Sequence, residues 1–130
     1  MTYQIKGTLY GFENTRDVEI REIDELFSTM VDVHNENISF ALVKPNLLRE
    51  YAFDLPADVK ALLNIDENST VSVYNILIIQ KPLDHSMINF LAPLVINNDN
   101  KYIAQAILDP KKYPDYGMAE SIKSFVTKEL

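Results

Sequence analysis

The stretch from residue 71 to residue 108 constrains the fold more than any other part of this chain. It holds two apolar runs, Ile76–Ile79 and Leu94–Ile96, and a third strand-like segment at Tyr102–Leu108. These segments are rich in β-branched residues and are bounded by turn-forming residues, which favours strands over helices. The first run does not alternate, so we expect both of its faces to be buried. The sequence therefore predicts a central group of strands around which the other segments pack.

Polar residues interrupt this apolar stretch at three places. Asn and Asp tolerate positive φ and bond to their own backbone, so the run Asn97-Asn98-Asp99-Asn100 predicts a tight turn between two strands. Pro93 cannot donate to a ladder, so its strand is expected to be an edge or to be bulged there. Asn89 has three interpretations: a strand residue that faces solvent, a buried amide with satisfied hydrogen bonds, or part of a partner interface.

Segments on both sides of this stretch predict further short strands. They are β-branched or alternate between apolar and polar residues. They lie at residues 3–9, 17–23, 28–33, 38–44 and 51–55. A strand count of seven or eight with few glycines favours a strongly bent antiparallel sheet or a small closed barrel.

Two short helices are also expected. The first opens at Pro56, a residue suited to the first helical position, with Asp58 placed favourably for the helix dipole. Its apolar stripe consists of Val59, Leu62 and Leu63. The second helix is predicted over residues 118–129, where apolar side chains recur at helical spacing. Its apolar side could pack on the sheet or dock on a partner.

Length and composition indicate one domain over residues 1–130. A chain of 130 residues can bury about two-thirds of its unfolded surface, so it needs no disulfide or metal to fold. The sequence contains no cysteine, which excludes disulfides and thiol catalysis and suits the cytoplasm. Because no apolar stretch has the length of a signal peptide or a membrane span, we expect a cytoplasmic protein without membrane contact.

The negative charge is concentrated in one segment. The net charge of the chain is −7, and residues 13–36 hold eight acids against only Arg16 and Arg21. An acidic patch repels phosphate backbones and attracts basic partners, although it could equally be a solvated face. In both cases direct binding of nucleic acid is disfavoured.

Signals for chemistry are weak. The adjacent letters Asp84-His85-Ser86 cannot form a catalytic relay, because triad partners come from separate segments that meet in space. The three glycines form no phosphate-binding loop, and His34 and His85 form no zinc motif. The sequence therefore predicts no enzyme, no cofactor and no metal. A hydrolase would need a cleft with perturbed acids or histidines, and an RNA-binding barrel would need a basic groove.

The run from Pro82 to Asn97 resembles the signature of the FliW flagellar assembly factors. Asn89, Ala92, Pro93 and Asn97 stand where that signature places them, while Phe90 before the leucine departs from its commonest form. Further segments are similar to the family in the same order along the chain. They are Gly11-Phe12, Ile38–Val43 with Pro45, Tyr51–Leu55, Gln105–Leu108 and Tyr113-Pro114.

This resemblance implies a non-enzymatic partner switch built on a small β-barrel-like domain. Proteins of this kind bind newly made flagellin in the cytoplasm and also bind the translational repressor CsrA. Flagellin that accumulates takes the FliW-like protein away and frees CsrA to repress flagellin mRNA. Two alternatives remain open: a flagellin chaperone that does not bind CsrA, and an interaction module with an unknown partner.

Two groups of residues are predicted to contact partners. The first is an exposed edge formed by Asn89, Phe90 and the turn that contains Asn97, Asn98 and Asp99. The second is the acidic segment, in which Glu19, Glu22 and Glu25 would supply charge complementarity to CsrA.

Overall fold

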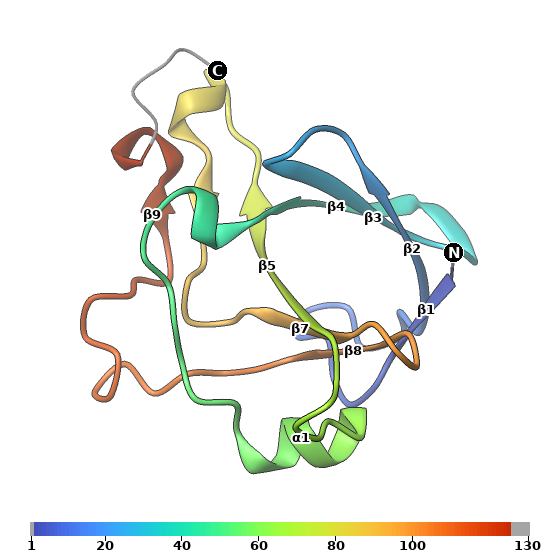
Figure 1. Ribbon diagram of the computed structural model, residues 1–130. Coiled ribbons are helices and arrows are strands. Elements are labelled where there is room, and N and C mark those ends of the chain that lie inside the picture. The colour runs from blue at the N-terminus through green and yellow to red at the C-terminus, as the bar shows by residue number, and fades with distance from the viewer. Residues whose placement is uncertain (1, 126–130) are drawn as a thin grey trace.

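The computed structural model describes residues 2–125 and is dominated by short strands (Figure 1). The strands are β1 (Thr2–Ile5), β2 (Asp17–Glu22), β3 (Phe27–Asp32), β4 (Asn35–Val43), β5 (Val71–Ile78), β6 (Met87–Ile88), β7 (Leu94–Asn97), β8 (Tyr102–Gln105) and β9 (Glu120–Ser121). The helical elements are α1 (Ala57–Leu63) and the 3₁₀ turns η1 (Pro45–Leu47), η2 (Leu83–His85) and η3 (Ile122–Ser124).

Seven of the strands in residues 2–125 close into a barrel. Their order is β4-β3-β2-β1-β8-β7-β5, and pairing of β5 with β4 completes the circle. Neighbouring strands are antiparallel except for β1 and β8, which are parallel. The short strands β6 and β9 extend the sheet beyond β5. The mostly β, barrel-like fold expected from the sequence is confirmed.

Alternation of side chains along the strands produces one core inside the barrel and two outside it. The interior is filled from all sides, for example by Val18, Met30 and Leu94, each with no exposed surface. Outside, α1 packs on β7 and β8, and the segment after η1 packs with the last described residues on β4, β5 and β6. Figure 1 shows that segment running along one side of the barrel to α1. These two covers leave charged residues exposed on the outer side of β2.

The strand predicted at residues 51–55 is absent, because its backbone bonds to tyrosine side chains and not to a ladder. The amide of Ala52 donates to the Tyr116 hydroxyl at 2.9 Å, and the same hydroxyl donates to the Ala52 carbonyl at 2.9 Å. The amide of Asp54 donates to the Tyr113 hydroxyl at 2.8 Å. Two aromatic side chains from the loop after β8 thus hold an extended segment that pattern alone assigns to a sheet.

The first helix is confirmed, with one difference in its apolar stripe. α1 follows Pro56 and ends at Asn64, whose φ of 55° gives the left-handed conformation that closes many helices. Val59 and Leu63 are buried against β7 and β8, whereas Leu62 is 42% exposed. A helix this short contacts the barrel over a narrow strip of its surface, so it buries only two of the three side chains in the predicted stripe.

The second predicted helix is wrong over residues 118–125, and the rest of the prediction lies outside the described residues. This part of the chain forms β9, which pairs with β6, and then the turn η3. The carboxylate of Glu120 accepts a hydrogen bond from the Gly117 amide at 2.6 Å and forms an ion pair with Arg49 at 3.2 Å. These tertiary contacts override the helical spacing of the apolar residues.

Candidate protein-interaction surface

The segment between β6 and β7 bulges away from β5. Residue 88 pairs with residue 77 and residue 94 with residue 74, so residues 89–93 lie opposite only two residues of β5. The buried side chain of Asn75 fills this gap and donates to the Asn89 carbonyl at 2.9 Å. The Asn89 side chain accepts the Leu91 amide at 3.0 Å and forms a turn within the bulge. The bulge expected at Pro93 is therefore present, and Asn89 is half-buried within it.

Phe90 does not form the exposed edge that the sequence predicts. Its side chain has no exposed surface and contacts the rings of Tyr51 and Phe125. Its amide donates to the Gly117 carbonyl at 2.9 Å, and its carbonyl accepts the Tyr51 hydroxyl at 2.6 Å. The bulge turns the aromatic ring toward the outer core, because burial there removes the apolar ring from water.

Tyr51 links this core to the bulge. Burial is the main reason that the pKa of its phenol rises to about 12. The unfolded chain ionises near pH 10, so the stability that the neutral buried phenol supplies is complete below pH 10 and is lost as the pH rises toward 12. We expect the urea midpoint to fall more steeply over this window in the native protein than in Tyr51→Phe, measured by circular dichroism. Equal slopes would contradict a buried, neutral phenol.

Asn97 is also buried, at 2% exposed, which corrects its predicted place on a surface edge. Its side-chain amide donates to the Leu63 carbonyl at the end of α1 at 2.9 Å, and its oxygen accepts the Asp99 amide at 3.0 Å. Asn98 donates to the Ser72 hydroxyl in β5 at 2.8 Å, and Asp99 accepts the amide of Thr70, just before β5, at 3.1 Å. The predicted turn is confirmed. It joins α1 to the barrel, with Asn98 half-buried and Asp99 exposed.

Replacing Asn97 by alanine should destabilise the protein by about 1–3 kcal/mol, because two hydrogen bonds of a buried side chain are lost. The Leu63 carbonyl keeps one partner, the side-chain amide of Asn100 at 2.9 Å. Chemical unfolding would measure the change. The matched control is Glu67→Ala, which alters an exposed loop residue near α1 and should change stability by less than about 0.5 kcal/mol. Equal stabilities of the two variants would show that the Asn97 amide is not needed to anchor α1.

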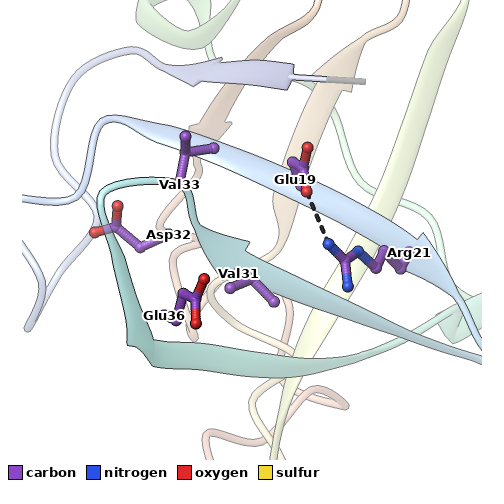
Figure 2. Close-up of a pocket in the computed structure, with 6 residues that line it drawn as sticks. All are labelled: Glu19, Arg21, Val31, Asp32, Val33 and Glu36. Carbon is purple, nitrogen blue, oxygen red and sulfur yellow. Dashed lines mark hydrogen bonds and ion pairs between the residues drawn. The ribbon is translucent and has the colours of Figure 1, made fainter.

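The acidic segment forms the outer side of the hairpin made by β2, β3 and the start of β4. A hollow of about 440 Å³ on this side is lined by Glu19, Arg21, Val31, Asp32, Val33 and Glu36. Figure 2 shows the carboxylates of Glu19 and Glu36 beside it, with Arg21 paired to Glu19 at 3.1 Å, whereas the carboxylate of Asp32 points away from the hollow. Acids therefore outnumber the single base in this hollow, and it is open to solvent on the exposed side of the hairpin. We call this hollow the acidic face, together with the hairpin tip between β2 and β3, which lies at the other end of the same pair of strands.

The acids of this face differ in how many hydrogen bonds and ion pairs they already form within the protein. Asp32 is buried and accepts the Thr15 hydroxyl at 3.2 Å and the His34 amide at 2.8 Å, so it serves the fold. Within residues 2–125, Glu22, Glu25 and Glu36 have no ion pair, and all three are exposed. The predicted residues Glu22 and Glu25 are thus accessible, and Glu19 is half-buried beside Arg21.

An apolar wedge lies where β4 and β5 diverge, and its other sides are formed by the loop between β1 and β2, by Ala92 before β7 and by Gln105 at the end of β8. Sequence reasoning missed this wedge. It has a volume of about 370 Å³ and is lined on its rim by Tyr10, Phe12, Ile78 and Ile79, which are 59%, 43%, 53% and 53% exposed. Asn89 and Ser39 also line it. The expectation that Ile76–Ile79 is buried on both faces is wrong at its last two residues, because the strand leaves β4 there. The signal for the wedge in the sequence was that the apolar run continues past the point where its strand stops pairing.

Other kinds of site find no support in residues 2–125. They contain no group of three or more His, Cys, Asp or Glu side chains arranged to hold a metal ion. No helix in this part of the chain is long and apolar enough to cross a membrane. The surface of these residues carries a charged face and an apolar wedge, and both features suit contact with another protein.

Comparison with known proteins identifies the family. The profile of the FliW protein family matches residues 1–121. The chain is 44% identical to flagellar assembly factor FliW 1 of Wolinella succinogenes over 126 residues, covering 97% of this chain and 98% of that one. It is 43% identical to flagellar assembly factor FliW 1 of Helicobacter pylori strain HPAG1, with 99% and 97% covered.

A solved structure supports the fold. The crystal structure of a flagellar assembly factor FliW superposes with a TM-score of 0.82 at 23% identity, covering 93% of this chain and 84% of that one. Together, these matches show that the chain belongs to the FliW family of flagellar assembly factors, which is not a family of enzymes. Its role is in flagellum assembly, and the resemblance found in the sequence is confirmed.

Proposed function

We propose that this protein binds flagellin and the translational repressor CsrA in the cytoplasm, and so couples flagellin synthesis to flagellum assembly. Membership of the FliW family carries this proposal. Flagellin and CsrA would compete for the protein, so CsrA is sequestered when flagellin is scarce and released when it accumulates. The switch requires no catalysed reaction, because it changes only which partner is bound.

The acidic face supports the CsrA part of this function. A repressor that binds RNA needs a basic surface, and Glu22, Glu25 and Glu36, which form no ion pair within residues 2–125, complement such a surface. Their charge would also repel the RNA backbone from the complex. The acidic face therefore suits a basic, RNA-binding partner.

Gel filtration of the purified protein, mixed separately with flagellin and with CsrA, tests the proposal. We expect a complex with each partner, and we expect the CsrA complex to dissociate as salt concentration rises, because screening weakens contacts between exposed charges. A complex with flagellin alone would leave a flagellin chaperone. The absence of both complexes would leave an interaction module of unknown partner.

A further inference from the structure

The apolar wedge arises where the barrel seam opens. β4 and β5 pair through Ala41↔Leu77, Leu42↔Ile76 and Val43↔Asn75, and their pairing stops there. Beyond this point Ile78 pairs with Met87 of β6 on the other side of β5, and the two strands diverge. The register of the pairs would place residue 79 opposite Ser39, but β5 has ended by then.

The backbone N–H and C=O groups of alternate residues in β4 point to opposite sides, and those of one residue face the wedge. The Lys44 amide donates to the Leu26 carbonyl at 3.0 Å, so residues 44, 42 and 40 direct their backbone groups toward β3. Residues 43, 41 and 39 therefore direct theirs toward β5. The first two are paired with Asn75 and Leu77, whereas Ser39 has no strand partner on that side among residues 2–125.

The wedge and the acidic face meet along β4. Ser39 lines the wedge and Glu36 lines the acidic hollow, and they are three residues apart on the same strand. Three residues of extended chain span about 10 Å. A bound segment that follows this edge would therefore place apolar side chains over Ile78 and Ile79 and a positive charge near Glu36.

We propose that the wedge receives an extended segment of a protein partner, which adds as a strand to the edge of β4 at Ser39. The segment carries apolar side chains that enter the wedge and a basic side chain about 10 Å away that reaches Glu36. The inference rests on the proposed function for the existence of a protein partner. A second copy of this chain is a poor occupant, because it carries the same net charge of −7 and the same acidic hollow beside this edge.

Synthetic peptides test the inference without either natural partner. The probe is a fluorescent eight-residue peptide of alternating isoleucine and lysine, and its control carries N-methyl groups on the amides of the pairing edge. Fluorescence anisotropy should show at least tenfold weaker binding of the methylated peptide, because methylation removes backbone donors while leaving every charge in place. Equal binding of the two peptides would mean charge attraction only and would overturn the inference.

Variants of the protein locate the contact. Ile78→Ser combined with Ile79→Ser should weaken the unmethylated peptide at least tenfold, and Glu36→Lys should weaken it severalfold. The matched control Glu67→Lys makes the same charge change on a distant exposed loop and should have a smaller effect. Amide exchange of Ser39 should slow when peptide binds. If that amide is already protected in a concentration-dependent way without peptide, the occupant is a second copy and the inference is overturned.

The double isoleucine variant also separates this inference from the proposed function. We expect it to lose at least one natural partner in gel filtration. If it binds flagellin and CsrA as the native protein does, the wedge has no part in recognition, while the proposed function stands. If the native protein binds neither partner, the proposed function fails, whatever the peptide shows.

Discussion

Replacing Phe90 by alanine is expected to cost about 3–5 kcal/mol of unfolding free energy, the range measured for removal of buried aromatic rings. The ring is completely buried in the outer core and lies within 5.6 Å of the Tyr51 ring centre and 5.3 Å of that of Phe125. The guanidinium of Arg49 lies 5.1 Å above it and also contacts Tyr116. Loss of the ring would therefore loosen three segments at once. Chemical unfolding measures the change.

A conservative variant separates packing from recognition. Phe90→Leu keeps most of the apolar volume, so it should lose clearly less stability than alanine, and its affinity for partners should stay near that of the native protein. If Phe90→Ala kept its melting temperature but lost a partner, the ring would belong to an interface after all. That outcome would support the surface edge predicted from the sequence and contradict the buried position.

Reversing the charge of Glu19, Glu22 and Glu25 to lysine should slow association with CsrA by about ten- to a hundredfold at low salt, because the acidic face steers a basic partner into contact. Two of these side chains are exposed and none of the three packs in a core, so the fold should be retained. Stopped-flow or surface-based kinetics would measure the rate. The difference from the native protein should shrink as salt concentration rises.

A control with the same change in charge tests whether position matters. Glu67, Asp66 and Asp58 lie in or near α1, away from the β2–β3 hairpin, and are exposed. Their conversion to lysine changes the net charge equally and should slow association much less. Equal slowing in both triple variants would show that only net charge counts, and unchanged kinetics in the first would remove the acidic face from CsrA recognition.

Much of the fold was predictable because it depends on local patterns. Alternation in β2 and β3, the turn after β7 and the start of α1 at Pro56 are each encoded within a few residues. Closure of the barrel by the parallel pair β1 and β8 was not predictable, since it joins residues about a hundred positions apart. The same holds for the tyrosine hydroxyls that hold residues 52–54.

The candidate site was predicted in part. Most acids of the acidic segment are exposed as expected, whereas Asp32 is buried and bonds to the fold. The signature around Asn89 and Asn97 was interpreted as an interface, yet its side chains mostly satisfy the backbone of a bulge and of α1. The sequence alone does not distinguish an asparagine whose side chain is buried from one that contacts a partner. The wedge at Ser39 depends on where two strands diverge, which no local pattern records.

Calorimetric titration of this protein with CsrA, repeated after saturation with flagellin, tests the central claim most directly. Mutually exclusive partners should give binding heat in the first titration and none in the second. Binding of CsrA that is undiminished by flagellin, or no binding of either protein, would contradict the claim.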